Sequence, residues 1–229
     1  MTQPADHWYL ENVDLFKFLC PRKMAHVPEA TKQEMAHEYK KGDFIYHAND
    51  PANKIFLLEE GRVKISSFSD SGKEIIKAIL QPGEIFGELL ILGAERRLNY
   101  ARAVDPVVKV CAMDFGILQG LMLENSEFSL RITKLIGLRL RQTERRLESL
   151  VFKDARTRIV EFLKDLADEY GRPVGTEVLV KNFLTHKDIA SLTATSRQTV
   201  TSILNDLRDQ NLIYFDRKRL LIRDVSKLN

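Results

Sequence analysis

The sequence predicts an α+β fold in which an antiparallel β-sandwich or barrel is followed by one long helix, and then by two short helices with a β-hairpin. Glycines recur between short apolar segments from Lys41 to Met113. Residues 126–152 contain no proline and one glycine, with apolar residues at helical spacing. Residues 184–222 show two short helical patterns and then two short apolar runs. The apolar period changes along the chain, which predicts three parts.

Length and charge agree with this division. At 229 residues with 44% hydrophobic residues, the chain can form one large domain or two small ones. We expect domain limits at 1–125, 126–154 and 155–229. The net charge is only +3, but it is unevenly distributed: residues 1–125 hold 15 Lys and Arg against 18 Asp and Glu, whereas residues 155–229 hold 13 against 10. The positive surplus of the C-terminal part favours a nucleic-acid partner there.

Several classes of protein are disfavoured by composition. No apolar run approaches the roughly 20 residues that a membrane-spanning helix needs. The N-terminus carries Asp6, Glu11 and Asp14 instead of an apolar export signal. Cys20 and Cys111 are too few for an iron–sulfur cluster, and the five histidines lack the spacing of a metal motif. We therefore expect a cytoplasmic protein with no membrane partner and no metal site.

The β-rich part is predicted from short runs of Ile, Val, Phe and Leu bounded by turn residues. The predicted strands lie at 44–46, 55–58, 63–65, 75–80 and 107–111. Asp70 to Lys73 is expected to form a hairpin turn, because Gly72 supplies the positive φ that such a turn needs. A metal enzyme of cupin type is the alternative for such a barrel, but the clustered His and Glu ligands that it requires are missing. We therefore predict that the protein is not an enzyme.

The long helix is predicted to cover residues 126–152, which is about 40 Å at 1.5 Å per residue. A heptad-like seam along it is typical of a coiled coil and comprises Ile136, Leu140, Thr143, Leu147 and Leu150. A second stripe, expected to pack on the β-rich part, comprises Phe128, Ile132 and Leu135. A lone amphipathic helix is the alternative, but charged residues flanking the seam favour a homodimer.

Residues 184–207 carry the most specific pattern in the chain. Thr185 followed by Asp188 resembles a capping box that starts a first helix, and Ser196 is placed to cap a second. The expected buried positions are Ile189, Ala190 and Leu192 in the first helix and Val200, Ile203, Leu204 and Leu207 in the second. Ala194 stands in the turn between them, where many such turns use glycine to reach a left-handed conformation. The pattern predicts a helix-turn-helix.

In such a motif the first residues of the second helix meet base edges in the major groove. We expect Arg197 and Gln198 to read bases, because Arg can bond guanine and Gln can bond adenine through two atoms. Thr201 and Ser202 lie on the same outer side. Phosphate contacts are expected from Thr185, His186, Ser196 and Ser202. The hairpin of 212–215 and 220–222 has a basic tip with Arg217 and Lys218, which suits either a DNA-contacting wing or an ordinary solvated turn.

Together these residues resemble the cyclic-AMP receptor/FNR (CRP/FNR) family of bacterial transcription regulators over nearly the whole chain. The resemblance is carried by Lys41 to Asp43, Glu60 to Val63, Pro82 to Leu89, Arg97 to Ala103, the long helix, and the helix-turn-helix. It implies a jelly-roll-like β-roll of the cyclic-nucleotide-binding type, a long dimerisation helix and a C-terminal winged helix-turn-helix. It also implies a homodimer on a palindromic site in double-stranded DNA, a hinge near Asp154, and contact with RNA polymerase.

The resemblance further implies an effector site in the β-roll. The corresponding positions are Gly87, Glu88, Leu89, Arg97, Leu98, Thr143 and Glu144. In cyclic-nucleotide-binding members, backbone N–H groups and an arginine matching Arg97 hold the phosphate, and a glutamate matching Glu88 meets the ribose. Here Leu98 replaces a hydroxyl residue, and Glu144 replaces a serine. Leu98 cannot bond a phosphate, and a second acidic group near one is unfavourable.

These departures disfavour cyclic AMP as the effector and leave three alternatives: another small effector, cyclic AMP itself, or DNA binding that needs no effector. Haem is not expected, because residues 84–110 contain no Cys or His. A regulatory cyclic-nucleotide module of a kinase or channel would leave the helix-turn-helix without a purpose. The sequence therefore favours a DNA-binding regulator.

Overall fold

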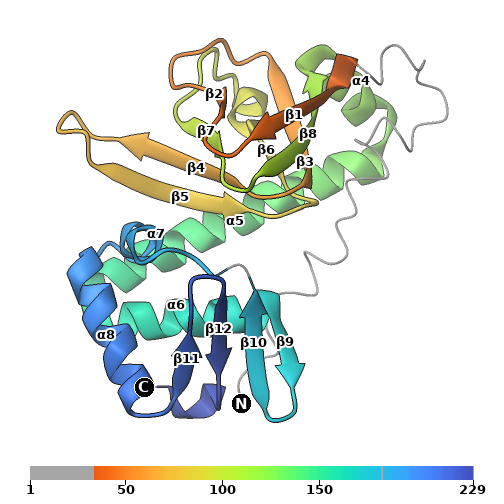
Figure 1. Ribbon diagram of the computed structural model, residues 1–229. Coiled ribbons are helices and arrows are strands. Elements are labelled where there is room, and N and C mark those ends of the chain that lie inside the picture. Colours follow the sequence, from red (N-terminus) through yellow and green to blue (C-terminus); the bar gives the residue numbers. More distant parts are fainter. Residues whose placement is uncertain (1–33, 182, 229) are drawn as a thin grey trace. The chain divides into compact units, whose positions relative to one another are not determined.

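The computed structural model describes residues 34–181 and 183–228 (Figure 1). The chain forms two compact units that divide within one long helix, between Arg139 and Leu140. We refer to residues 34–139 as the N-terminal unit and to the described residues from 140 onward as the C-terminal unit. The expectations about Cys20 and about the acidic N-terminus lie outside the described residues.

The N-terminal unit contains two four-stranded antiparallel sheets, with strand orders β1-β8-β3-β6 and β2-β7-β4-β5. The strands are β1 (Ala36–Lys40), β2 (Phe44–Tyr46), β3 (Lys54–Glu60), β4 (Val63–Phe68), β5 (Glu74–Leu80), β6 (Ile85–Phe86), β7 (Tyr100–Ala103) and β8 (Val107–Asp114). A short 3₁₀ helix, η2 (Glu88–Leu92), follows β6. The antiparallel β-rich domain predicted from the glycine pattern is thereby confirmed.

Strand β3 is buried on both of its faces, and this explains the continuous apolar run in its sequence. Ile55 and Leu57 belong to one buried cluster. Phe56 and Leu58 belong to a second cluster, together with residues of both sheets. Because successive side chains of a strand point to opposite faces, a strand buried on both sides has no polar alternation. The first cluster also takes in helices α4 (Phe115–Glu124) and α5 (Ser126–Phe152).

In the N-terminal unit three strands were not predicted, namely β1, β6 and β7. Strand β1 has no buried residue, so its sequence gives no apolar signal. Strand β7 buries only the small residues Ala101 and Ala103. The predicted hairpin turn between β4 and β5 is present: Gly72 has φ +77°, and Ser69 N donates to Lys73 O at 3.0 Å.

Helix α5 covers the predicted residues 126–152. Phe128, Ile132 and Leu135 are buried in the first cluster, which confirms that this stripe packs on the β-rich part. Within the described residues, no helix is long and apolar enough to cross a membrane.

The C-terminal unit packs three helices against a four-stranded sheet of order β11-β12-β10-β9 around one core. Its elements are α6 (Ala155–Tyr170), β9 (Gly171–Val174), β10 (Glu177–Lys181), α7 (His186–Leu192), α8 (Arg197–Asp209), β11 (Ile213–Phe215), β12 (Arg219–Ile222) and η3 (Val225–Lys227). The interpretation of residues 172–175 as a loop was wrong, because Arg172 and Pro173 pair with β10. Pro173 is tolerated since β9 is an edge strand.

Candidate functional site

The helix-turn-helix begins each of its helices with a side-chain cap. Thr185 Oγ1 accepts from Asp188 N at 3.1 Å, and α7 starts at the next residue, His186. Ser196 Oγ accepts from Thr199 N at 3.0 Å, and α8 starts at Arg197. Each cap satisfies a backbone N–H that has no partner within the helix. Both predicted helix starts are confirmed.

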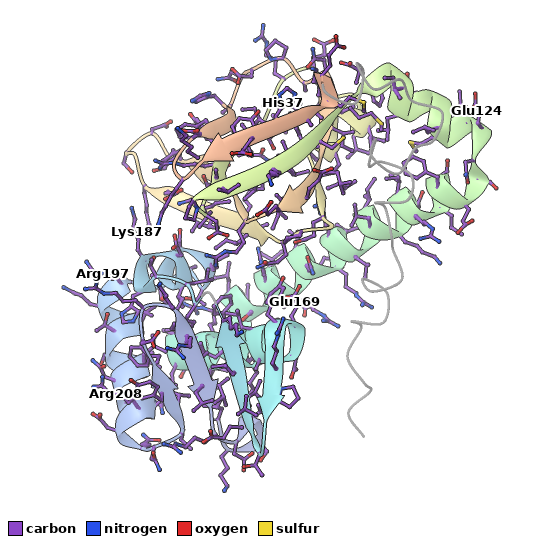
Figure 2. The ribbon with its side chains drawn as sticks, turned by 45° about the vertical axis from the view of Figure 1, so that its right-hand side comes forward. His37, Glu124, Glu169, Lys187, Arg197 and Arg208 are labelled. Atoms are coloured by element: carbon purple, nitrogen blue, oxygen red, sulfur yellow. The ribbon has the colours of Figure 1, made fainter. Side chains whose placement is uncertain are left out.

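Helix α8 separates an apolar face from a polar one. Val200, Leu204 and Leu207 are buried, as predicted, while Ile203 is half-buried. Arg197 and Gln198 are exposed on the first turn, and Ser202 is exposed on the second. Figure 2 shows Arg197 at the start of α8. The first turn therefore offers a guanidinium and an amide to a ligand.

Thr201 has a different environment from its neighbours. Its hydroxyl donates to Arg197 O at 2.9 Å and lies 2.8 Å from His186 Nδ1. Because a hydroxyl has one proton, the second contact requires Nδ1–H to be the donor. Thr201 and His186 thus join α8 to α7. The Thr201 hydroxyl is already engaged and is less available to DNA than the predicted role assumed.

The same contact fixes the tautomer of His186. Partial burial, and secondarily the charge of Arg197, lower the pKa of this imidazole. The neutral ring with Nδ1–H has an acceptor at Nε2, so it cannot donate to a phosphate through that atom. A phosphate contact through Nε2 of His186 therefore requires the imidazolium form.

The wing tip is held by Asp216. Its carboxylate accepts from Lys218 N at 2.7 Å and from Arg219 N at 2.8 Å. This turn leaves Arg217 and Lys218 exposed at the end of the β11–β12 hairpin. Two positive charges are thereby held at the position where sequence analysis expected them.

The predicted effector region begins at a glycine that no other residue can replace without strain. Gly87 has φ +81° and directly precedes η2. A Cβ at this position would lie 2.7 Å from Arg97 Nη1. The absence of a side chain at Gly87 therefore leaves room for the Arg97 guanidinium.

Arg97 is buried, with 5% of its surface exposed. Its guanidinium donates to Gly87 O at 3.2 Å and to Lys54 O, and it lies 4.5 Å from the centre of the Tyr46 ring. Its buried Nε has no hydrogen-bond partner among the described residues. Burial lowers the pKa of Arg97. The predicted anion-binding arginine is therefore enclosed by backbone carbonyls and an aromatic ring.

Glu88 forms an ion pair with Arg139, and Arg139 also donates to Ile85 O. Sequence analysis did not identify Arg139 as a site residue. Its position four residues before Thr143 is the signal that could have revealed it, because residues i and i+4 share one helix face. The carboxylate expected to bind a ribose is thus already neutralised by a residue of α5.

The remaining predicted effector residues do not all join this group. Leu89 is half-buried in η2. Leu98 is 64% exposed and has no polar atom in its side chain. Thr143 and Glu144 lie on α5 in the C-terminal unit, where both are exposed. Gly87 and Arg97 suit an anionic group, but Leu98 adds no donor for the phosphate of a cyclic nucleotide. Within the described ranges, no group of three or more His, Cys, Asp or Glu side chains is arranged to hold a metal ion.

The predicted dimer seam is mostly solvent-exposed. Leu140, Leu147 and Leu150 are among the exposed large apolar residues, and Thr143 is exposed as well. Ile136 instead packs against the core cluster of the N-terminal unit. Beyond the predicted seam, Val151 and Phe152 are also exposed.

Known protein families match both the N-terminal and the C-terminal part of the chain. The family "cyclic nucleotide-binding domain" matches residues 36–125, and the family "Crp-like helix-turn-helix domain" matches residues 157–229. The global nitrogen regulator of Synechococcus elongatus is 32% identical over 187 residues, covering 81% of this chain and 84% of that protein. The CRP-like cAMP-activated global transcriptional regulator of Mycobacterium tuberculosis is 29% identical over 198 residues, covering 86% and 88%.

Solved structures give the same result. A variant of CooA from Carboxydothermus hydrogenoformans superposes with a TM-score of 0.79 at 28% identity, covering 95% of this chain and 94% of that one. FixK2 from Bradyrhizobium japonicum shares the fold, with a TM-score of 0.74 at 20% identity over 84% of this chain and 94% of that one. The curated relatives are transcription regulators and not enzymes. The chain therefore belongs to the CRP/FNR family of transcription regulators and carries a helix-turn-helix DNA-binding domain.

Proposed function

We propose that the protein acts as a homodimer that binds a palindromic promoter site, and that a small effector in the N-terminal unit controls this binding. In this proposal residues 1–125 sense the effector, residues 126–154 form the dimerisation helix and hinge, and residues 155–229 bind DNA. The observation that carries it is the exposure of Arg197 and Gln198 on the first turn of α8, directly after the Ser196 cap.

The chemistry of these two side chains suits base recognition. Arg197 can donate two hydrogen bonds to guanine, and Gln198 can exchange two with adenine, each pair contributing about 1–3 kcal/mol of discrimination. Ser196 and Ser202 supply hydroxyl groups for phosphates, and the wing adds positive charge. Thr185 is a further candidate, although its hydroxyl already donates to Asp188 Oδ2 at 2.6 Å. The exposed seam of α5 supports pairing with a second copy, which would place two α8 helices on half-sites about 34 Å apart.

Selection from a random DNA duplex pool tests the DNA-binding part of the proposal. Full-length protein is incubated with the pool, and bound duplexes are sequenced over several rounds. We expect a two-fold symmetric consensus whose half-sites are one helical turn apart. Recovery of unrelated sequences, or of a single half-site, would contradict the homodimeric reader. Light scattering of the free and DNA-bound protein gives the number of chains in each state.

The effector is proposed to be a small anion, because Gly87 and Arg97 form an enclosed positive group with an unpartnered buried Nε. Relatives in the family include a regulator described as cAMP-activated and another described as a nitrogen regulator. Cyclic AMP remains disfavoured, since Leu98 offers no donor to a phosphate. DNA binding without an effector is the second candidate, and the existing Glu88–Arg139 pair supports it.

Calorimetric titration separates these candidates. Full-length protein is titrated with cyclic AMP, cyclic GMP and a set of small metabolite anions, each with and without the selected duplex. We expect a metabolite anion to bind and to change the affinity for DNA. Micromolar binding of cyclic AMP would reverse the preference based on Leu98. Full DNA affinity that no compound changes would favour the effector-independent regulator.

A further inference from the structure

The turn between α7 and α8 contains a non-glycine residue in a left-handed conformation. Ala194 has φ +49°, a left-handed conformation that strains a residue with a Cβ. Thr195 N donates to Ala190 O at 2.9 Å, which is the hydrogen bond of a Schellman motif with Ala194 in the usual glycine position. The direction in which the chain leaves α7 and enters α8 depends on this turn.

One arginine binds both carbonyls at the turn. Arg158, on the first turn of α6, donates from Nε to Thr193 O at 2.9 Å and from Nη2 to Ala194 O at 3.3 Å. These carbonyls follow the last turn of α7, where helix C=O groups lack intrahelical partners. A guanidinium at that end both satisfies them and interacts favourably with the helix dipole. Arg158 therefore favours the strained conformation that Ala194 adopts.

The same guanidinium reaches a second segment. Arg158 Nη1 donates to Lys153 O at 2.7 Å. Lys153 lies in the connector between α5 and α6, and the next residue, Asp154, caps α6 by accepting from Thr157 N at 2.7 Å. The three nitrogens of one side chain thus join the α5–α6 connector to the α7–α8 turn. Lysine has a single nitrogen and cannot reproduce this fork.

We propose that Arg158 is a positioning residue that orients α8 for DNA recognition by bracing the Ala194 turn against the Lys153 connector. This inference rests on the proposed function, because it assigns a role in specific DNA binding. Arg158 itself does not touch DNA. A change in the connector reaches the recognition helix through this side chain.

A double-mutant cycle tests the proposal in the full-length protein. The variants are Arg158→Ala, Ala194→Gly and the double variant, with Arg158→Lys added to keep the charge. Two affinities are measured for each, one for the duplex selected by the wild type and one for a duplex of random sequence. Arg172→Ala is the charge-matched control, because Arg172 is an exposed arginine of β9 in the same unit.

We expect Arg158→Ala to lower the ratio of specific to random affinity by about tenfold or more, the size expected for losing a charge-assisted hydrogen bond. Arg158→Lys should behave similarly. Ala194→Gly alone should leave the ratio within about twofold, and in the double variant it should restore much of the loss, because glycine adopts the turn without strain. Arg172→Ala should lower both affinities together.

Two results would overturn the proposal. Additive effects of Arg158→Ala and Ala194→Gly would show that Arg158 does not act through the turn. An equal loss of affinity for both duplexes, of the size found for Arg172→Ala, would show that Arg158 contributes only its positive charge. Denaturant unfolding of the same variants separates a failure of the Arg158 proposal from a failure of the proposed function. If the wild type selects no consensus but the unfolding cycle still shows coupling, then DNA recognition is wrong while the Arg158 brace stands as a structural contact.

Discussion

The arginines of the two candidate sites differ in their surroundings. In the N-terminal unit, Arg97 and Arg139 are directed at backbone carbonyls and at Glu88. In the C-terminal unit, Arg197 and Arg217 are exposed on a helix start and a hairpin tip, and Figure 2 shows Arg197 on the surface. An enclosed charge suits a ligand small enough to be surrounded, whereas an exposed charge suits a large polyanion. This difference agrees with the proposed roles of the two units.

The two sites also differ in how they are assembled. The outer face of α8 is defined by local rules within one stretch of chain, namely two caps and an apolar spacing. The Arg97 site combines Lys54, Gly87 and Arg97 from three segments. The start and the apolar face of α8 therefore depend on its own stretch of chain, while the Arg97 site depends on contacts between three segments. The predictions below test this contrast.

The largest effect is expected at Gly87. Gly87→Ala introduces a Cβ at a positive φ and 2.7 Å from Arg97 Nη1, so we expect a loss of about 2–4 kcal/mol in the free energy of unfolding. Chemical denaturation measures it. Gly72→Ala is the matched control, because Gly72 also has positive φ but no atom within 4 Å of the added Cβ. Equal losses for the two variants would show that Arg97 is not held closely against Gly87.

The next effect concerns base reading by Arg197. Arg197→Ala should cost about 1–3 kcal/mol of binding free energy on the selected duplex and relax the preference at one base pair of each half-site. Gel-shift titrations with single-base variants of the duplex measure both quantities. The free energy of unfolding should stay within about 0.5 kcal/mol, because the side chain is exposed. A loss of the same size on every duplex would make Arg197 a phosphate contact.

A smaller effect is expected at the α8 cap. Ser196→Ala should lower the free energy of unfolding by about 1 kcal/mol, because Thr199 N loses its acceptor. Ser196→Asp should restore stability, since Asp also caps helices, yet weaken DNA binding through repulsion of phosphate. Unfolding and DNA titrations on the same samples separate the two roles. Full DNA affinity for Ser196→Asp would remove Ser196 from the phosphate contacts.

The smallest effect is the titration of His186, followed by NMR of its ring protons. We expect its pKa below 6.5, and we expect Arg197→Ala to raise it only partly, because burial is the larger cause. The sign for stability follows from linkage: the unfolded chain takes up this proton first, so stability is fully present above pH 6.5 and decreases as the pH falls below it. His186→Gln should remove that component. A pKa above 6.5 would contradict the effect assigned to burial and to the charge of Arg197.

Local signals allowed much of the C-terminal unit to be predicted from sequence. Thr185, Ser196 and the apolar spacing of α8 gave the helix limits, because caps and amphipathic faces act over a few residues. Ala194 was identified as a left-handed position, and its φ of +49° confirms this. Strand β9 was missed because its Arg172 and Pro173 give no apolar signal, and only pairing with β10 reveals it.

The candidate effector site was only partly predictable for a related reason. Gly87, Glu88 and Arg97 were identified through the family resemblance, but the contacts that surround them are long-range. Arg97 reaches carbonyls 10 and 43 residues away in sequence. Arginine is rarely buried, so nothing in its local sequence indicates enclosure. The Glu88–Arg139 pair likewise joins η2 to a helix that begins long after it.

The exposed end of α5 has a consequence for gene control. The exposed side chains of Leu147, Leu150 and Phe152 would be covered in the proposed homodimer. Two chains must then associate before they can bind both halves of a palindromic DNA site. By mass action, promoter occupancy would rise more steeply than the amount of protein while monomers predominate. Synthesis and degradation of the chain would then act as regulatory inputs alongside any metabolite.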